Sequence, residues 1–316
     1  MTRGSQGVRT TAHAHAQFTQ TDVRAAVAGL RGSASFRAPL REYTSFKIGG
    51  PADVVCEPAD IEDVCLVVRQ ARAHKVPLFV LGGTNLLIRD GGIRGIVVSL
   101  ARLRAIKEEP TAVLYAEGGV GMPTLIGYAI RHSLAGLEWA AGIPGTAAGC
   151  VVMNAGTKLG EMKDSIKAVR MVNMKGQVVD MEAAQVKFEY RRALLPRGIV
   201  VGVWVQLKQG VRSEIARVVK DYLHYRRDTQ PLAMPSAGCV FKNPPNGSAG
   251  QLIEASGLKG TRVGDAEVSM KHANFMVNRG QARAADVIAL IGEVRSTIRR
   301  RTGVRLDLEL KIVGET

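Results

Sequence analysis

Apolar residues recur every three or four positions in several stretches of the chain, and this spacing predicts amphipathic helices. In residues 61–74 the positions Ile61, Val64, Cys65 and Val68 share one face of such a helix. That placement makes Cys65 a predicted core residue. The same spacing predicts a helix over 21–30 capped by Thr21 or Asp22, further helices over 123–132, 213–228 and 251–256, and a long helix from 286 onward.

Short apolar runs between these helices predict β-strands. They cover 77–81, expected to be a buried strand, and 96–100, 113–116, 169–172, 178–181, 199–207 and 275–278. Residues 306–312 alternate strictly, which predicts a strand with one buried face and with Glu309 on its polar side. This mixture of elements, in a chain of 316 residues, predicts an α+β fold with two or three domains.

A glycine-rich stretch, Gly82-Gly83-Thr84-Asn85-Leu86, follows the predicted strand 77–81. Glycines allow positive φ and a close backbone approach, so the N–H groups can form a nest for a pyrophosphate. The stretch lacks the lysine of a P-loop, which argues against nucleoside triphosphate chemistry, and it lacks the full G-x-G-x-x-G pattern. Taken alone, it is equally well explained as an ordinary turn between two strands.

A second glycine-rich stretch covers 142–149 and is followed by Asn154-Ala155-Gly156. The two stretches together resemble the FAD-binding domain of p-cresol methylhydroxylase-type and vanillyl-alcohol oxidase-type flavoproteins, in which both loops enclose one flavin. The resemblance implies a cofactor-binding set of Gly82, Gly83, Thr84, Asn85, Leu86, Gly142, Ile143, Pro144, Gly145, Thr146, Gly149, Asn154 and Gly156.

The net charge of +15 suits either nucleic acid or small anionic ligands. We find no helix-turn-helix, zinc-finger or RNA-binding signature, and aromatic residues make up only 5% of the chain, so small anions are the favoured partners. No apolar run approaches the ~20 residues of a membrane span. Residues 1–17 are polar, basic and acid-poor, as in organellar transit peptides, but a disordered tail is the simpler interpretation.

The four cysteines, Cys56, Cys65, Cys150 and Cys239, include no C-x-x-C pair, and the histidines do not pair with them. Neither a metal site nor a disulfide framework is therefore predicted. Free cysteines fit a reducing compartment, so a cytoplasmic protein is expected.

Several polar residues are candidates for chemistry, each with a simpler alternative. Cys239 follows a glycine, and an ordinary thiol, with a pKa of about 8.5, can donate a proton at neutral pH, or it can be buried and inert. Arg191 suits a carboxylate or phosphate, or it is a surface arginine. Glu309 lines a cleft, or it is exposed to solvent. Lys242 and Asn243 follow Cys239 on a turn that suits a ligand, and His272 is more commonly structural than catalytic.

With these residues in view, the chain closely resembles the UDP-N-acetylenolpyruvoylglucosamine reductase family, flavoenzymes of bacterial peptidoglycan synthesis. The matching motifs follow family order: Thr44 to Asp53, Gly82 to Leu87, Asp90 to Gly95, Ala141 to Thr146, Met153 to Gly156, Tyr190-Arg191, Pro235 to Pro244, Ser269 to Phe275, and Leu308-Glu309-Leu310. Tyr190-Arg191-Arg192 leads directly to Leu194-Leu195-Pro196, without the longer insertion of one subtype, so the chain is similar to the type II form.

The resemblance implies a p-cresol methylhydroxylase-type FAD-binding fold of two subdomains, at 21–102 and 103–210, after a disordered tail at 1–20. It implies a substrate-binding α+β domain at 211–316, whose terminal strand returns to the active-site cleft. Arg191, Cys239 and Glu309 are the implied catalytic residues. The chain departs from the family pattern in having Cys239 where the proton donor is usually serine, Lys47 where an arginine is usual, and Ala193 at an often polar position.

The implied reaction is the NADPH-dependent reduction of the enolpyruvyl ether of UDP-N-acetylglucosamine by non-covalently bound FAD, with no metal. The expected substrate-binding residues are Tyr190, Arg226, Lys242, Asn243 and His272. Two other functions compete: an FAD-dependent oxidase of a sugar or hydroxy acid, and a flavin-free binding module. The first often carries a flavin-bonding histidine in the cradle, and none is present in 82–86.

Overall fold

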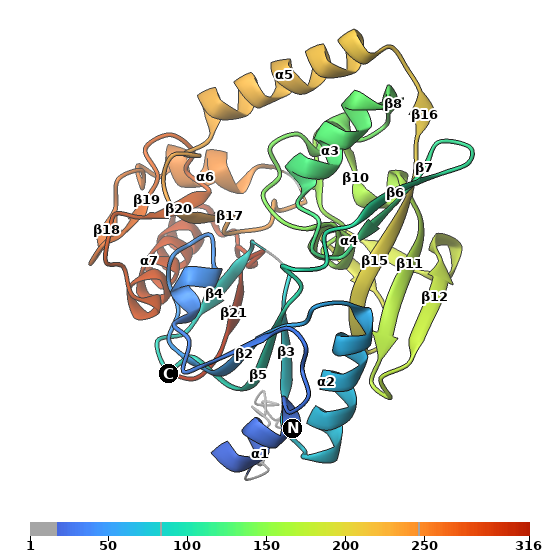
Figure 1. Ribbon diagram of the computed structural model, residues 1–316. Coiled ribbons are helices and arrows are strands. Elements are labelled where there is room, and N and C mark those ends of the chain that lie inside the picture. Colours follow the sequence, from blue (N-terminus) through green and yellow to red (C-terminus); the bar gives the residue numbers. More distant parts are fainter. Residues whose placement is uncertain (1–17, 83, 246) are drawn as a thin grey trace, which may run out of the picture.

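The computed structural model describes residues 18–82, 84–245 and 247–316, which form three larger β-sheets with helices packed against them (Figure 1). A disordered tail is predicted at 1–20, and residues 1–17 of it lie outside the described residues. Helix α1 (Gln20–Ala26) begins one residue earlier than expected, because Thr19 and Asp22 cap it reciprocally. The predicted caps Thr21 and Asp22 are therefore wrong as N-caps, although Asp22 takes part in the capping box.

The first sheet has the order β1-β2-β5-β3. Its strands are β1 (Ser33–Phe36), β2 (Ala52–Glu57), β5 (Ile93–Ser99) and β3 (Leu78–Leu81), of which the last three are mutually parallel. Helix α2 (Ile61–Ala73) connects β2 to β3 and buries Cys65 in the core, as predicted. Strand β3 is half-buried instead of buried, because it lies at the edge of the sheet.

The second sheet is antiparallel, with the order β12-β11-β15-β7-β6. Its strands are β6 (Ile106–Glu109), β7 (Val113–Glu117), β11 (Ile166–Asn173), β12 (Val178–Glu182) and β15 (Gly198–Gln206). The strands predicted at 113–116, 169–172, 178–181 and 199–207 are thereby confirmed, with slightly different ends. Helices α3 (Met122–Arg131) and α4 (Ala147–Val152) contribute buried residues to the core between this sheet and the first.

The third sheet has the order β17-β20-β19-β18 and is also antiparallel. It consists of β17 (Ser236–Cys239), β18 (Arg262–Val263), β19 (Ala266–Val268) and β20 (Phe275–Asn278), with α6 (Ala249–Ala255) and the long α7 (Ala284–Thr302) packed on it. Helix α5 (Arg212–Thr229) crosses from the second sheet to the third along the top of Figure 1. These elements confirm the predicted helices at 213–228 and 251–256 and the long helix near 286.

Buried side chains show which parts of the chain pack together. One cluster joins the first and second sheets and includes Val219 and Tyr222 of α5. A separate cluster forms the core between the third sheet and helices α6 and α7. It includes Phe46 and Ile48 from near the start of the chain, as well as Leu87. The segment around Phe46 and the glycine-rich stretch before Leu87 are therefore fixed against the third sheet by burial of apolar surface.

The end of the chain does not form the continuous strand predicted at 306–312. Only β21 (Lys311–Val313) is a regular strand, and it pairs in parallel with β4 (Leu86–Ile88) beside the first glycine-rich stretch. Leu308 makes a single bridge to Phe241. The pairing is interrupted because the N–H groups of Glu309 and Leu310 both donate to the Val240 carbonyl. The chain thus changes partner, from the third sheet to β4, at Glu309.

Short elements complete the fold. The small strands are β8 (Leu134–Ala135), β9 (Gly156–Thr157), β10 (Gly160–Glu161), β13 (Lys187–Glu189), β14 (Arg192–Leu194) and β16 (Lys208–Gln209), and the 3₁₀ helices are η1 (Leu40–Tyr43), η2 (Glu138–Ala140), η3 (Met162–Asp164) and η4 (Ala183–Gln185). Among the helices of the described residues, none has both the length and the apolar character that crossing a membrane requires.

The first turn of α7 is capped by a side chain that is distant in sequence. The Asp90 carboxylate accepts the N–H groups of Ala284 at 2.9 Å and Ala285 at 3.0 Å. We expect Asp90→Ala to lower the free energy of unfolding by ~1 kcal/mol, because two helix N–H groups lose their acceptor. Asp90→Asn keeps one acceptor oxygen, so its free energy of unfolding should fall by less.

Urea unfolding of the three proteins measures this difference. Asp221→Ala is the control, because Asp221 forms only an exposed ion pair within α5 and its removal should change stability little. Equal unfolding midpoints for Asp90→Ala and wild type would show that the Asp90 contact contributes nothing.

Candidate active site

A cavity of about 480 Å³ opens where the two glycine-rich stretches meet the third sheet and the C-terminal end of α5. From the predicted cofactor-binding set, its wall includes Gly82, Thr84, Asn85, Ile143, Pro144, Gly145, Gly149 and Gly156. From the predicted catalytic and substrate-binding sets, it includes Arg191, Cys239, Glu309, Arg226, Asn243 and His272. Folding therefore brings together residues that lie more than two hundred positions apart, around a space of the size that small-molecule sites have.

The two glycine-rich stretches touch each other through their backbones. A Cβ atom at Gly149 would lie 1.6 Å from the Gly82 carbonyl oxygen, so only glycine fits there. The Thr84 hydroxyl donates to the Pro144 carbonyl at 3.0 Å, and the Thr146 hydroxyl donates to the Gly82 carbonyl at 3.5 Å. This part of the wall is thus one cradle built from both stretches, with backbone exposed where side chains are missing.

Some predicted site residues do not lie on the cavity wall. They are Leu86, Gly142, Thr146, Asn154, Tyr190 and Lys242, while Gly83 lies outside the described residues. Leu86 is buried at the start of β4, and Thr146 caps α4. A Cβ atom at Gly142 would lie 3.1 Å from Leu223 and 3.3 Å from Arg226, so Gly142 packs closely against α5.

Asn154 is buried and already bonded to the protein. Its Nδ2 donates to the Glu161 carboxylate at 2.7 Å and to the Glu189 carbonyl at 3.1 Å, and its Oδ1 accepts the Lys163 N–H at 3.0 Å. These bonds hold the β13–β14 hairpin against the segment after α4. The structure thus places Asn154 as a support of the hairpin and not, as the sequence suggested, on the cofactor wall.

Arg191 occupies the two-residue turn of the β13–β14 hairpin with a φ of 57°, a conformation uncommon for a non-glycine residue. From this turn its Nε lies 3.1 Å from Oε1 of Glu309. The two side chains are 22% and 15% exposed, so the ion pair is largely shielded from water. The alternatives of a surface arginine and a solvent-exposed glutamate are therefore excluded.

Burial sets the protonation of the acidic groups in the cavity. It raises the pKa of Glu309 above its ordinary value, although Arg191 beside it acts in the opposite direction. Burial, together with the neighbouring Glu309 charge, raises the pKa of Cys239 to about 12. The thiol therefore holds its proton throughout the neutral range. It forms far less of the reactive thiolate than a thiol with the ordinary pKa of about 8.5 would form.

Asn85 has a structural connection that sequence reasoning missed. The side-chain Nδ2 of Asn85 donates to the backbone carbonyl of Glu309 at 3.1 Å. The backbone carbonyl of Asn85 accepts the Lys311 N–H at 2.9 Å. On the other side, Glu309 N–H donates to the carbonyl of Val240, the residue after Cys239, at 2.9 Å. The glycine cradle, Glu309 and Val240 are thus joined by direct hydrogen bonds, and Cys239 precedes Val240 in the chain. No local pattern predicts a contact across 224 positions.

Hydrogen bonds fix the orientation of the Arg226 side chain, and burial with a hydrogen bond fixes the charge of His272. The Arg226 guanidinium is buried and donates to the Ala141 carbonyl at 3.1 Å and to Oε1 of Gln230 at 2.8 and 3.0 Å. Burial lowers the pKa of His272, and its Nδ1 accepts the Asn274 N–H at 3.2 Å, so the imidazole is neutral at neutral pH. Hydrogen bonds within the protein thus fix both side chains where they line the cavity.

The wall also contains residues that were not predicted as site residues. The Lys158 ammonium lies 3.7 Å from the centre of the Tyr225 ring, which stacks on Tyr222. Tyr222 lies on the buried side of α5. The loop that carries Lys158 gave no local sign that it would reach α5.

Comparisons with known proteins agree with this geometry. Residues 230–313 match the family model of the UDP-N-acetylenolpyruvoylglucosamine reductase C-terminal domain, and residues 52–182 match that of an FAD binding domain. The UDP-N-acetylenolpyruvoylglucosamine reductase of Moorella thermoacetica is 44% identical over 289 residues, which cover 91% of this chain and 95% of the relative. That of Syntrophus aciditrophicus is 41% identical over 307 residues, which cover 95% and 97%.

The chain belongs to the UDP-N-acetylenolpyruvoylglucosamine reductase family. The crystal structure of the reductase from Thermus caldophilus superposes with a TM-score of 0.77 at 36% identity, covering 90% of this chain and 99% of that one. The resemblance inferred from the motifs and the predicted α+β, FAD-binding fold are therefore confirmed. As a member of this reductase family the protein is an oxidoreductase. Within the described residues, no three His, Cys, Asp or Glu side chains are grouped as a metal site requires.

The raised pKa of Glu309 predicts how stability depends on pH. A carboxyl group whose pKa is higher in the folded than in the unfolded protein stabilises the fold below the unfolded value, and this contribution is lost as pH rises through the folded value. Glu309→Gln cannot ionise. Relative to wild type, its free energy of unfolding should therefore increase as pH rises from the ordinary value of 4.5 through the raised pKa.

Denaturant unfolding at a series of pH values measures this difference. Glu293→Gln, on the exposed side of α7, makes the same substitution outside the cavity and is the matched control. A constant difference between Glu309→Gln and wild type over the whole series would contradict the assigned direction.

Proposed function

We propose that this enzyme reduces the enolpyruvyl ether of UDP-N-acetylenolpyruvoylglucosamine to UDP-N-acetylmuramate in peptidoglycan precursor synthesis, with NADPH as electron source and non-covalent FAD. The relatives' name supplies the substrate class, and the matched FAD binding domain supports the cofactor. The observation that carries the proposal is the meeting of Arg191, Glu309 and Cys239 on the wall of a cavity that also contains the glycine cradle.

The cradle suits a flavin dinucleotide. Gly82 and Gly145 are partly exposed backbone on the wall, Gly149 lets the two stretches approach, and Thr84 supplies a hydroxyl there. When bound, FAD supplies the hydride for the reduction. Cys150 also lines the cavity, but burial raises its pKa to about 12 and keeps the thiol neutral, which favours non-covalent binding.

The catalytic residues act on the substrate as its methylene carbon gains a hydride. Negative charge then moves toward the adjacent carboxylate, where the Arg191 guanidinium stabilises it. Burial raises the pKa of Glu309, and in its protonated form this residue would donate a hydrogen bond to the same group directly or through water. Cys239 transfers its proton to the carbon that bore the charge, so that one hydride and one proton convert the C=C bond to CH₃–CH.

Substrate contacts complete the proposed site. Arg226, Asn243 and His272 line the cavity. Tyr190 and Lys242 do not, but the Arg191 guanidinium lies 5.0 Å from the centre of the Tyr190 ring, and the charge of Lys242 acts to lower the pKa of Glu309. We assign these five residues to substrate binding, the last two through closure around the ligand. We likewise propose that residues 21–102 and 103–210 are the flavin-binding subdomains and that residues 211–316 are the substrate domain.

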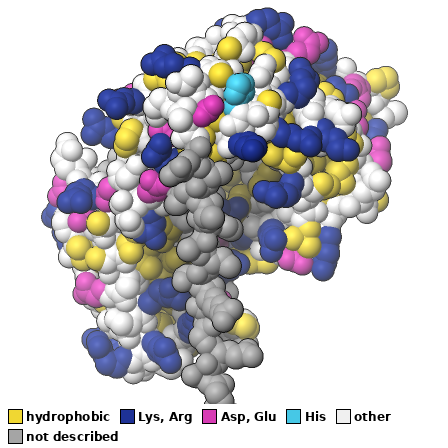
Figure 2. Space-filling model, turned by 90° about the horizontal axis from the view of Figure 1, so that it is seen from below, with side chains coloured by type: hydrophobic (Ala, Val, Ile, Leu, Met, Phe, Trp, Pro, Cys, Tyr) yellow, Lys and Arg dark blue, Asp and Glu magenta, His cyan; other side chains and the backbone are white. Residues whose placement is uncertain are grey.

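The basic character of the chain fits this function. Figure 2 shows Lys and Arg side chains distributed over one face of the molecule, with fewer acidic side chains among them. FAD, NADPH and the substrate are all anionic, so the positive potential attracts them without any role in nucleic-acid binding. The four free thiols support a cytoplasmic location.

The decisive experiment follows NADPH oxidation by the flavin-containing protein with and without the enolpyruvyl nucleotide. We expect oxidation only in its presence, and a product heavier by two hydrogen atoms. Oxygen-dependent oxidation of a sugar instead would indicate the competing oxidase. Acid precipitation separates the alternatives further, since non-covalent flavin stays in the supernatant, covalent flavin enters the pellet, and a flavin-free binding module is colourless.

Replacing Cys239 tests the proton donor. Cys239→Ala should slow the reaction of the reduced enzyme with the enolpyruvyl nucleotide by roughly 10²-fold or more, the usual size of a general-acid contribution. Cys239→Ser, which keeps a proton on a smaller atom, should remain active. Reduction of the enzyme by NADPH should stay near the wild-type rate in both, because the proton is needed only afterwards.

Stopped-flow absorbance of the flavin separates the two half-reactions in the three proteins. If Cys239→Ala is reoxidised by the nucleotide as fast as wild type, the proton comes from water or another side chain. Because the thiol pKa is about 12, wild type should also react slowly with a thiolate-selective reagent at neutral pH.

A further inference from the structure

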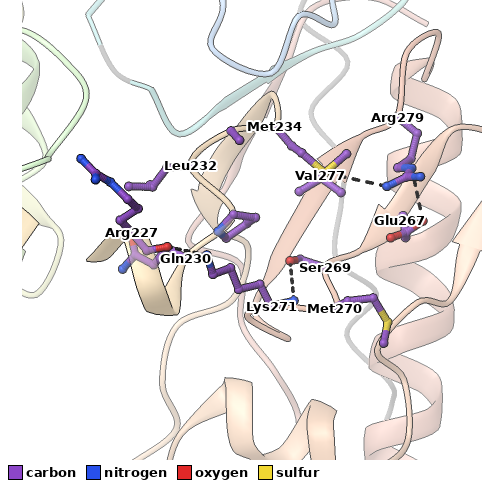
Figure 3. Close-up of a pocket in the computed structure, with 12 residues that line it drawn as sticks. Arg227, Gln230, Leu232, Met234, Glu267, Ser269, Met270, Lys271, Val277 and Arg279 are labelled. Carbon is purple, nitrogen blue, oxygen red and sulfur yellow. Dashed lines mark hydrogen bonds and ion pairs between the residues drawn. The ribbon is translucent and has the colours of Figure 1, made fainter. Parts of the chain in front are cut away.

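Polar side chains lie around the active-site cavity on two sides. On the side of the third sheet, a second pocket of about 320 Å³ contains the Lys271 ammonium, which donates to the Arg227 carbonyl (Figure 3). On the side of the second sheet, Asn154 is buried, although its chain neighbours Met153 and Ala155 line the cavity. No step of the proposed reaction uses Asn154.

Asn154 has a backbone conformation that few residues adopt. Its φ is 39°, in the left-handed region, and it directly follows Met153, the C-cap of α4. Asparagine tolerates this conformation better than most residues that have a side chain. At the other end of α4, Thr146 caps the helix and donates to the Gly82 carbonyl. One short helix therefore separates Asn154 from the glycine cradle.

The Asn154 amide bonds to three separate segments of the chain. Nδ2 donates to the Glu161 carboxylate on β10 at 2.7 Å and to the Glu189 carbonyl at the end of β13 at 3.1 Å. Oδ1 accepts the N–H of Lys163 in η3 at 3.0 Å. Both N–H groups of the amide are thus used, and the side chain is shielded from competing water, so its orientation is fixed.

The bond to Glu189 fixes the turn that carries Arg191. Glu189 pairs with Arg192 at the end of the β13–β14 hairpin, and Arg191 lies between them in a left-handed conformation. The guanidinium is held by the same part of the chain, because a Cβ atom at Gly156 would lie 3.0 Å from Nη1 of Arg191. Residues 154–156 therefore fix the backbone that precedes Arg191 and also contact the end of its side chain.

Glu161 is the charged partner of the Asn154 amide. One of its carboxylate oxygens accepts from Asn154, and the other lies 2.5 Å from Nζ of Lys163. On the short β9–β10 hairpin Glu161 pairs with Gly156, and a Cβ atom at Gly156 would lie 2.7 Å from the Glu161 Cβ. A hydrogen bond to an ionised acceptor is stronger than one to a neutral group, so Glu161 strengthens the hold on Asn154.

We propose that Asn154 is a positioning residue, whose amide, bound to Glu161, holds the Arg191 guanidinium where negative charge develops in the substrate. This inference rests on the proposed function, in which Arg191 stabilises that charge. Asn154 does not line the cavity and acts only through Arg191. Its effect is therefore confined to the step that Arg191 serves, the reaction of the reduced enzyme with the enolpyruvyl nucleotide.

Asn154→Asp is the most direct test, because it replaces the amide nitrogen by an oxygen and changes little else. The variant keeps an acceptor for the Lys163 N–H but turns an oxygen toward Glu161 and Glu189 in place of a donor. Asn154→Asp/Glu161→Gln restores a donor, since the glutamine amide can bond to the new carboxylate. Asn173→Asp is the matched control, because Asn173 also accepts backbone N–H groups through Oδ1 but lies outside the cavity.

Stopped-flow absorbance of the flavin measures both half-reactions in the flavin-containing proteins. Reoxidation of Asn154→Asp by the enolpyruvyl nucleotide should slow roughly tenfold or more, because a displacement of about 1 Å can cost a catalytic group up to 10²-fold in rate. Reduction by NADPH should stay near the wild-type rate. Asn154→Asp/Glu161→Gln should recover most of the loss, and Asn173→Asp should match wild type in both half-reactions.

A double-mutant cycle tests whether Asn154 acts through Arg191. Arg191→Ala should itself slow reoxidation. Adding Asn154→Asp to Arg191→Ala should slow it further by about twofold or less, because residues that act through one another do not have additive effects. Equal slowing by Asn154→Asp in the presence and absence of Arg191 would overturn the proposal.

Reoxidation of Asn154→Asp at the wild-type rate would also overturn the proposal, as would equal slowing of both half-reactions or no recovery in Asn154→Asp/Glu161→Gln. If Asn154→Asp does not fold with flavin, Glu161→Ala and Glu161→Gln take its place. Glu161→Ala removes the acceptor and should slow reoxidation, whereas Glu161→Gln keeps one acceptor oxygen and should not, so equal rates would contradict the role. Failure of the proposed function looks different, because the nucleotide would not reoxidise reduced wild type at all.

Discussion

Backbone hydrogen bonds hold Glu309 from two sides, and the arrangement of the active site depends on them. Its N–H donates to the Val240 carbonyl of the third sheet, and its carbonyl accepts from the Asn85 side chain of the glycine cradle. Immediately afterwards the chain pairs with β4 as β21. Because main-chain positions are fixed more tightly than long side chains, this junction sets the distance between the cofactor wall and Cys239 before any ligand binds.

The junction also explains the electrostatics of the cavity. A glutamate anchored there is withdrawn from water, and Arg191, held in a left-handed turn, lies against it. Removing one partner of such a pair would leave a buried, uncompensated charge. The same withdrawal from water keeps the Cys239 thiol protonated. One geometric feature thus brings a cation, a carboxyl group and a protonated thiol together on one cavity wall.

The third sheet contributes more than a cover for the flavin-binding part. Phe46, Ile48 and Leu87 join its core, and the Asn278 amide donates to the Phe46 carbonyl at 3.2 Å. The sheet is therefore bound to the segment that carries the cradle. The same sheet also contributes Phe275 to the wall of the cavity.

The sequence alone determined the family, the α+β class, most helices and strands, and the identity of Arg191, Cys239 and Glu309 as candidates. Periodicity identifies elements, and glycine patterns identify close backbone approaches, because both are local in the chain. The interruption of the terminal strand at Glu309, the contact between Asn85 and Glu309, the role of Asn154 and the raised pKa of Cys239 became visible only in three dimensions. They depend on burial and on partners far away in sequence, and neither is encoded in the neighbouring residues.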